Sequence, residues 1–216
     1  MYSFFFKIFR KIKYKIRYHY RPYTIFNFLN YKSIFIDIGG NMGTVSQYVL
    51  DVCNPKLIEI YEPHNLLYLN IKKKFKNYRN INIYNNAVSN SNSQGFLYLR
   101  NKDDKDLSLL AGSSLEKNKK NINKLHSQKI ELIHIQEIIS KFKYIDCIKI
   151  DIEGHEYKIL DYLIKNKNKI GKLVCEFHGS DIDIKKNKNI EFRQSYQKYR
   201  DVIKELEKEN WLVCWD

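Results

Sequence analysis

The stretch IDIGGNMGT, residues 36–44, decides the fold. An apolar, β-branched run that starts at Ser33 reaches the carboxylate of Asp37 and continues directly into three glycines. Apolar residues then recur at the spacing of one helix face, at Val45, Tyr48, Val49 and Val52. A buried strand that passes through a glycine turn into a helix is typical of the first unit of a nucleotide-binding α/β fold.

The same alternation of strand and helix continues along the chain. We expect further strands at 56–61, 81–84, 96–99, 129–134, 147–152, 172–177 and 211–215, with helical patterns between most of them. This order predicts an α/β fold of the Rossmann-like type, with a mostly parallel twisted sheet and helices on both faces. Two polar segments, 101–128 and 181–194, show no clear period, and we interpret them as surface loops.

Positive charge is concentrated at the N-terminus. The net charge of the 216-residue chain is +14, and eight basic residues but no acid precede Asp37. We therefore divide the chain into a basic amphipathic arm, 1–30, and one domain, 31–216. The arm carries apolar residues at helical spacing, at Phe5, Ile8, Phe9, Ile12 and Ile16. It could lie on an anionic membrane, pack on the domain with its basic face in water, or contact nucleic acid phosphates.

Composition excludes several classes of protein. The four cysteines are scattered without a C-x-x-C pair, which argues against a disulfide framework or a structural zinc site and favours a reducing compartment. No apolar run approaches the roughly 18 residues of a membrane-spanning helix. The sequence therefore predicts a cytoplasmic protein, with a membrane-peripheral location as the alternative that the arm leaves open.

Polar residues follow several of the predicted strands. In an open parallel sheet, ligands bind outside the carboxyl ends of the strands. Carboxylates stand at four such ends, and amides at a fifth: Asp37; Glu62; Asn85 and Asn86; Asp151 and Glu153; Glu176, followed by His178. Alone, each acid could be a helix cap or a solvated loop residue. Their joint placement indicates a ligand site.

The glycine pattern differs from that of dinucleotide enzymes. It reads D-x-G-x-x-x-G rather than G-x-G-x-x-G. We expect the glycines to let the backbone approach a ligand. A carboxylate at Asp37 would repel a pyrophosphate and attract an ammonium or sulfonium cation. Glu62, 23 residues after Gly39, is placed to accept hydrogen bonds from ribose hydroxyls. Together these features predict S-adenosylmethionine as the cofactor.

Six stretches carry a more specific resemblance: FIDIGGNMGTVS, IYEPHNLLYLNIKKK, IYNNAVSN, IHIQEII, IDCIKIDIEGHEYKIL and LVCEFH. In order and spacing they resemble the motifs of the FkbM family of S-adenosylmethionine-dependent methyltransferases, over about residues 33–178. The resemblance implies a class I methyltransferase fold that methylates hydroxyl oxygens, often on sugars or natural products. It implies that the turn holds the methionine end of the cofactor, Glu62 the ribose, and Asn86 and Ala87 the adenine. The predicted cofactor-binding residues are Asp37, Gly39, Gly40, Asn41, Met42, Gly43, Ser46, Glu62, Asn86, Ala87 and Asp151.

The chain departs from the family pattern in two places. The predicted strand 211–215 is the sixth, so we expect a sheet without the usual seventh, antiparallel strand, unless the strand count is off by one. The basic arm is also not shared with the family.

Methyl transfer to a hydroxyl requires a group that accepts the proton. The candidates are His178, Glu153, His155 and Asp151. His178 ranks first because an imidazole normally titrates near neutral pH. Glu153 and Asp151 alternate at a strand exit, so we expect one to face the cofactor and the other to face away. A divalent metal held by Asp151 and a neighbouring acid stays an alternative, but no metal ligand is predicted.

One absent motif narrows the acceptor. Enzymes that methylate base amines resemble one another in an Asn/Asp-Pro-Pro-aromatic motif after the fourth strand, and residues 151–154 read DIEG. Nucleic acid is therefore not an expected partner. The predicted function is O-methylation of a carbohydrate or small-molecule acceptor, which the two polar segments would contact. The alternatives are a membrane- or RNA-associated binding protein on a degenerate methyltransferase scaffold and, more remotely, a nicotinamide-dependent dehydrogenase.

Overall fold

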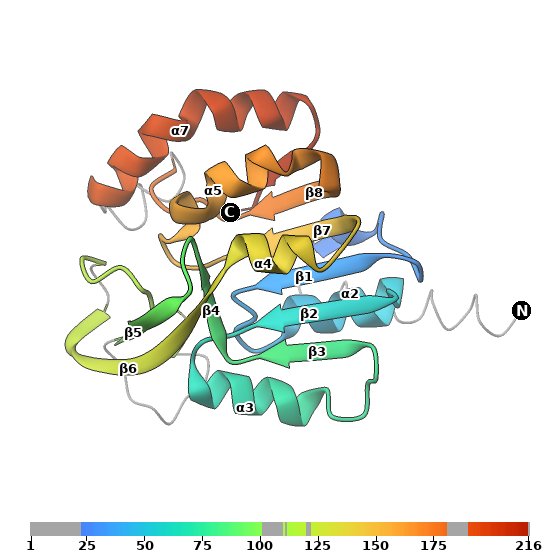
Figure 1. Ribbon diagram of the computed structural model, residues 1–216, viewed down its shortest axis with the longest axis horizontal. Helices are drawn as coiled ribbons and strands as arrows, with labels where there is room; N and C mark the ends of the chain where they lie inside the picture. The colour runs from blue at the N-terminus through green and yellow to red at the C-terminus, as the bar shows by residue number, and fades with distance from the viewer. Residues whose placement is uncertain (1–22, 101–109, 111, 120–121, 181–189, 216) are drawn as a thin grey trace, which may run out of the picture.

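The computed structural model describes residues 23–100, 110, 112–119, 122–180 and 190–215, and Figure 1 shows their arrangement. A six-stranded sheet has the order β3-β2-β1-β7-β8-β9, and all its neighbouring strands pair in parallel. Its strands are β1 (Ile34–Ile38), β2 (Leu57–Tyr61), β3 (Ile81–Tyr84), β7 (Ile145–Ile150), β8 (Ile170–Cys175) and β9 (Leu212–Cys214). The predicted fold class is confirmed, and within the described residues this sheet has no antiparallel seventh strand.

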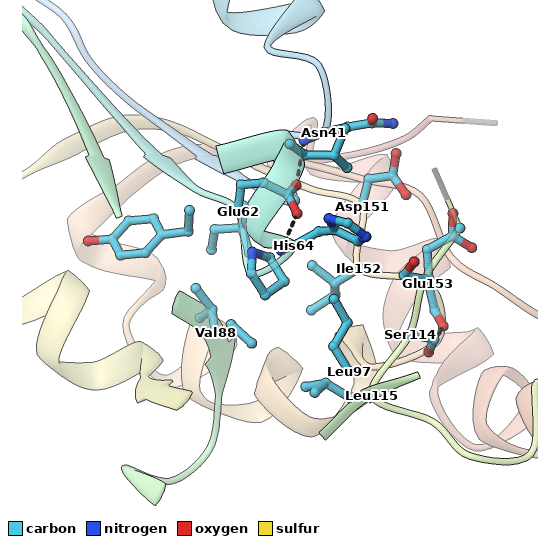
Figure 2. A pocket seen from close by; sticks show the side chains of 18 of the residues that line it. Asn41, Glu62, His64, Val88, Leu97, Ser114, Leu115, Asp151, Ile152 and Glu153 are labelled. Carbon is cyan, nitrogen blue, oxygen red and sulfur yellow. Dashed lines mark hydrogen bonds between the residues drawn. The ribbon is translucent and has the colours of Figure 1, made fainter. Parts of the chain in front are cut away.

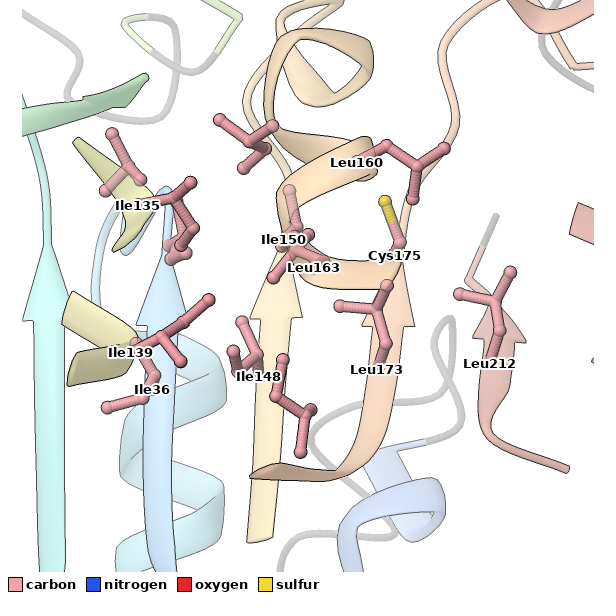
Figure 3. Packing of buried hydrophobic residues seen from close by; sticks show 14 of the residues in the cluster. Ile36, Ile135, Ile139, Ile148, Ile150, Leu160, Leu163, Leu173, Cys175 and Leu212 are labelled. Atoms are coloured by element: carbon pink, nitrogen blue, oxygen red, sulfur yellow. The ribbon is translucent and has the colours of Figure 1, made fainter. Parts of the chain in front are cut away.

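Helices cover both faces of the sheet. One face packs against η1 (Tyr23–Phe26), α2 (Thr44–Cys53) and α3 (Asn65–Lys74); the other packs against α4 (Ile135–Ser140), α5 (Glu156–Lys165) and α7 (Ile190–Lys208). The short turn η3 (Lys167–Lys169) precedes β8. Because strand side chains alternate, Phe35 packs in the core between the sheet and η1, α2 and α3, and Ile36 packs in the core on the opposite face. Figure 3 shows this opposite core, where Ile36, Ile148 and Leu173 of the sheet pack with residues of α4 and α5.

A second, smaller sheet lies at the end of the large sheet where the arrowheads of its strands point (Figure 1). It has the order β4-β6-β5, built from β4 (Asn86–Ser89), β5 (Ser93–Arg100) and β6 (Ile122–His134). Strand β6 pairs in parallel with β4 and antiparallel with β5. The prediction of a loop over 101–128 is therefore wrong from Ile122 onward. Residues 124–127 are all exposed, so this part of the strand has no alternating apolar pattern to reveal it.

Two other predicted boundaries also move. Helix α7 starts at Ile190, inside the segment predicted as a loop to residue 194. Phe26 and Leu29, which we assigned to the arm, are buried in the core of the domain. The apolar stripe of the arm lies outside the described residues, so its membrane contact stays a prediction. Among the residues that the structure describes, no helix is both long and apolar enough to cross a bilayer.

The glycine turn packs tightly against the neighbouring strand exit. Gly39 has a φ of 78°, and a Cβ atom there would lie 1.9 Å from the carbonyl oxygen of Asp151. A Cβ atom on Gly40 would lie 2.3 Å from the Cγ2 atom of Ile60. The missing Cβ atoms thus allow segments of the protein itself to pack closely at Gly39 and Gly40, and the approach of a ligand to this turn stays a prediction.

A buried ion pair joins this turn to β7. Asp37 and Lys149 are register partners on adjacent parallel strands, and both are almost completely buried. The Nζ atom of Lys149 lies 3.3 Å from Oδ1 of Asp37 and donates to the carbonyl oxygen of Gly39 at 2.7 Å. Burial favours the neutral amine, but the charges of Asp37 and Asp151 outweigh it and raise the pKa of Lys149. The hydroxyl of Ser46 donates to the other oxygen of Asp37 at 2.6 Å.

We expect the Lys149→Met variant to lose about 3–5 kcal/mol of unfolding free energy, because it leaves the carboxylate of Asp37 buried without its cation. The double variant Lys149→Met/Asp37→Leu should recover a large part of that loss, since it removes both charges. Urea unfolding measures both. Lys158→Met, on the exposed face of α5, is the control and should stay within about 0.5 kcal/mol of wild type. A double variant no more stable than Lys149→Met would contradict this account of the pair.

Candidate functional site

A cavity opens at the carboxyl ends of β1, β2 and β7, between the large sheet and the small one. Its volume is about 630 Å³ when the open space at its mouth is included. Predicted site residues that line it are Gly39, Asn41, Glu62, Asn86, Ala87, Asp151 and Glu153. Figure 2 shows Glu62 facing Asp151 and Glu153 across the cavity, with Val88, Leu97 and Leu115 forming an apolar wall.

Glu62 is fixed in place by two backbone amides. It follows β2 directly, and its carboxylate accepts hydrogen bonds from the N–H groups of Asn41, at 2.6 Å, and His64, at 2.8 Å. The side chain is buried. Burial raises the pKa of Glu62 to about 7, although the two amides and the charge of Lys149 act in the opposite direction. The carboxylate retains lone pairs that can accept further hydrogen bonds from a ligand in the cavity.

The amides of the glycine turn are already used within the protein. The N–H groups of Gly39 and Gly40 both donate to the carbonyl oxygen of Tyr61, at 3.0 and 3.1 Å, and that of Asn41 donates to Glu62. A phosphate site at such a turn requires free amides that point at the anion. This turn therefore does not offer the usual pyrophosphate cradle. Instead the Oδ1 atom of Asn41 is a buried acceptor that has no hydrogen-bond partner among the described residues.

Five predicted cofactor-binding residues do not line the cavity: Asp37, Gly40, Met42, Gly43 and Ser46. Asp37 is completely buried, and its side chain points to the α2 face, where it meets Ser46 and Lys149. The predicted contact between Asp37 and a cationic ligand group is therefore wrong. The cause is strand alternation, which places Asp37 on the same face as Phe35 and away from the cavity.

Asp151 and Glu153 both line the cavity, so the predicted alternation between them is wrong. Strand β7 ends at Ile150, before either residue, and Glu153 adopts a left-handed backbone conformation with a φ of 58°. The period-two rule applies only within a strand. The carboxylate of Glu153 pairs with the ammonium of Lys119 and lies 3.0 Å from Nε2 of His178.

His178 is held between two carboxylates. Its backbone N–H donates to Glu156 at 2.7 Å, and its Nδ1 atom lies 3.2 Å from the same oxygen. Burial favours the neutral ring, but Glu156 and Glu153 raise the pKa of His178 well above its ordinary value. In turn, burial would raise the pKa of Glu153, but His178 and Lys119 hold it below its usual range. The geometry does not support the prediction that His178 acts as the base, because both carboxylates favour the protonated ring and the ring lies outside the cavity lining.

His155 also lies outside the cavity lining. Its Nε2 atom is 2.9 Å from the hydroxyl oxygen of Ser89, and its Nδ1 atom is 2.7 Å from a carboxylate oxygen of Glu116. Both ring nitrogens therefore have protein partners. The structure does not place His155 where it could take a proton from a molecule in the cavity.

Asp151, Glu153 and His178 form a group whose potential metal-binding atoms lie within 4.8 Å of one another. Glu153 already pairs with Lys119 and His178. A divalent cation here would take the place of Lys119 and require the neutral ring of His178. We assign no metal ligand.

The sequence interpretation missed two kinds of residue. Lys149 is one of them: a lysine within a buried apolar strand requires a counter-charge, and its register partner Asp37 supplies one. Leu110 and the range 112–115, which line one side of the cavity, come from a stretch without any period. That stretch does belong to the predicted segment 101–128, where we expected acceptor contacts.

The family model described as methyltransferase FkbM domain matches residues 37–210, most of the chain. No curated protein sequence gives a significant match.

Several solved structures are similar to the chain at low sequence identity. An FkbM methyltransferase from Methylobacillus flagellatus KT is 13% identical, with a TM-score of 0.42, over 65% of this chain and 33% of that one. A precorrin-6y C5,15-methyltransferase from Geobacter metallireducens GS-15 is 13% identical, with a TM-score of 0.42, over 81% of this chain and 67% of that one. A dimethyladenosine transferase from Plasmodium falciparum is 14% identical, with a TM-score of 0.35, over 68% of this chain and 34% of that one.

The alignment thus spans only about a third of the FkbM methyltransferase from Methylobacillus. The family match itself covers the glycine turn, every strand end that forms the cavity and helix α7. The chain therefore belongs to the family of proteins with an FkbM methyltransferase domain.

Proposed function

We propose that this protein is an S-adenosylmethionine-dependent methyltransferase that methylates a hydroxyl oxygen of a carbohydrate or small molecule. The observation that carries the cofactor assignment is the buried carboxylate of Glu62, fixed at the cavity wall beside a turn whose amides are already used. A ligand with ribose hydroxyls and no pyrophosphate suits this arrangement. Family membership supports the transfer reaction.

The cavity has hydrogen-bond acceptors and apolar walls that suit such a cofactor. Glu62 would accept hydrogen bonds from the ribose, and the buried Oδ1 atom of Asn41 would accept one from a donor on the ligand. Ala87, Val88 and Leu97 offer apolar surface for the adenine. When bound, the cofactor supplies an electrophilic methyl group on a sulfonium.

Two carboxylates remain to handle the acceptor hydroxyl, Asp151 and Glu153. Glu153 is a weak base, because His178 and Lys119 lower its pKa. We therefore assign the proton to Asp151 and the orientation of the acceptor, through a hydrogen bond, to Glu153. A neighbouring hydroxyl, as in a sugar, would find the second carboxylate as its partner.

Calorimetric titration with S-adenosylhomocysteine tests the cofactor assignment. Wild type should bind, and Glu62→Gln should weaken binding by about tenfold or more, because the amide removes one acceptor and the negative charge. Glu131→Gln, exposed on β6, is the control and should bind like wild type. Absence of heat with folded wild-type protein would refute the assignment.

The raised pKa of Glu62 predicts a pH dependence of cofactor binding. Ribose hydroxyls donate to the ionised carboxylate, and a carboxyl group with a pKa of about 7 becomes protonated as the pH falls below 7. The dissociation constant should therefore be nearly constant above pH 8 and rise by up to about tenfold per pH unit below 7. In the Glu62→Gln variant this dependence should disappear. An equal slope in both proteins would assign the titration to another group.

Transfer of a labelled methyl group to a panel of glycans and polyols tests the acceptor class. The proposal predicts a methyl ether, which resists alkaline hydrolysis. A base-labile methyl ester, or label on an amine, would contradict O-methylation of a hydroxyl while leaving the cofactor assignment intact.

A further inference from the structure

His155 joins two walls of the cavity without lining it. The residue precedes α5 and is 8% exposed. Its ring lies between Ser89, the last residue of β4, and Glu116, in the segment Gly112–Lys119. Because a carboxylate only accepts hydrogen bonds, Nδ1 must carry the proton that is donated to Glu116. In the neutral ring, Nε2 is then the acceptor for the hydroxyl of Ser89, whose oxygen lies 2.9 Å from Nε2 and 3.3 Å from the alternative acceptor Oδ1 of Asn90.

Ser89 and Glu116, the two partners of the His155 ring, each lie next to residues that line the cavity. On one side, Ala87 and Val88 of β4, next to Ser89, line the wall assigned above to adenine. On the other side, the range 112–115, close to Glu116, lines the opposite part of the cavity. The three side chains Ser89, His155 and Glu116 thus form a continuous hydrogen-bonded path from one wall to the other.

The segment Gly112–Lys119 is held to the turn 153–155 by two more side chains. The hydroxyl of Ser114 donates to the carbonyl oxygen of Glu153 at 2.7 Å, and Lys119 pairs with the carboxylate of Glu153. These two contacts attach the segment to Glu153 alone. The backbone of Ser114 also pairs with that of Tyr98 on β5, next to Leu97 of the apolar wall. The path through His155 is the side-chain contact that carries the segment to β4, the strand of Ala87 and Val88.

We propose that His155 is a positioning residue that couples adenosine binding on β4 to the ordering of the acceptor-side segment Gly112–Lys119. This inference rests on the proposed function. A ligand packed on Ala87 and Val88 restrains β4, which fixes Ser89 and, through the imidazole, Glu116. The acceptor wall is then complete only after the adenosine ligand has bound, so the cofactor binds before the acceptor.

Hydrogen exchange measured by mass spectrometry on the full chain, with and without saturating S-adenosylhomocysteine, tests the coupling. In wild type, the ligand should slow exchange in the peptide that covers 112–119 by about tenfold, the effect expected of a charge-assisted hydrogen bond. Glu116→Ala should abolish this ligand-dependent change. Glu116→Gln should retain most of it, because the amide oxygen can still accept the proton of Nδ1.

The difference between the free and bound states separates coupling from a purely structural role. A residue that only stabilises the segment would change exchange equally in both states. Glu131→Ala, on the exposed side of β6, should behave like wild type. If calorimetry shows binding to wild type but exchange in 112–119 does not respond, the coupling is refuted and the proposed function stands. If wild type does not bind S-adenosylhomocysteine, the proposed function itself fails.

Discussion

The buried ammonium of Lys149 is the constraint on which the site depends. It neutralises Asp37 and binds the carbonyl oxygen of Gly39, so it fixes the start of the glycine turn against β7. The amides of Gly39 and Gly40 donate to the carbonyl oxygen of Tyr61, and the amide of Asn41 donates to the carboxylate of Glu62. The position of the ligand-facing carboxylate therefore follows, through successive hydrogen bonds, from one charge that lies behind the cavity.

A second set of buried charges determines the chemistry on the opposite wall. Glu156 holds His178, and His178 together with Lys119 holds Glu153. The left-handed conformation of Glu153 turns its side chain into the cavity, and conformations of this kind persist only where the surrounding contacts enforce them. Glu153 and His178 therefore each favour the charged form of the other, with a lowered pKa for the carboxyl group and a raised pKa for the imidazole.

The sequence predicts the fold well because strand and helix periods are local properties. The mostly parallel sheet, Glu62 at the end of β2 and the carboxylates after β7 all follow from patterns within a few residues. The features that it could not predict depend on contacts between residues that lie far apart in the sequence. The direction of Asp37 depends on Lys149 and Ser46, the charge on His178 depends on Glu156, and the first half of β6 has no buried face to mark it. Residues 112–115 became part of the cavity only through contacts with Tyr98 and Glu153.

These contacts also change the physical reason for excluding a pyrophosphate. The sequence suggested repulsion by Asp37, but the ammonium of Lys149 lies 3.3 Å from that carboxylate, so the pair presents little net charge to the cavity. Exclusion instead follows from the hydrogen-bond inventory of the turn, since Gly39, Gly40 and Asn41 have already donated their amide protons within the protein. A phosphate entering there would exchange hydration for no new donor from these residues. A ribose hydroxyl, which can donate, would find in the fixed carboxylate of Glu62 an acceptor that replaces its lost hydration.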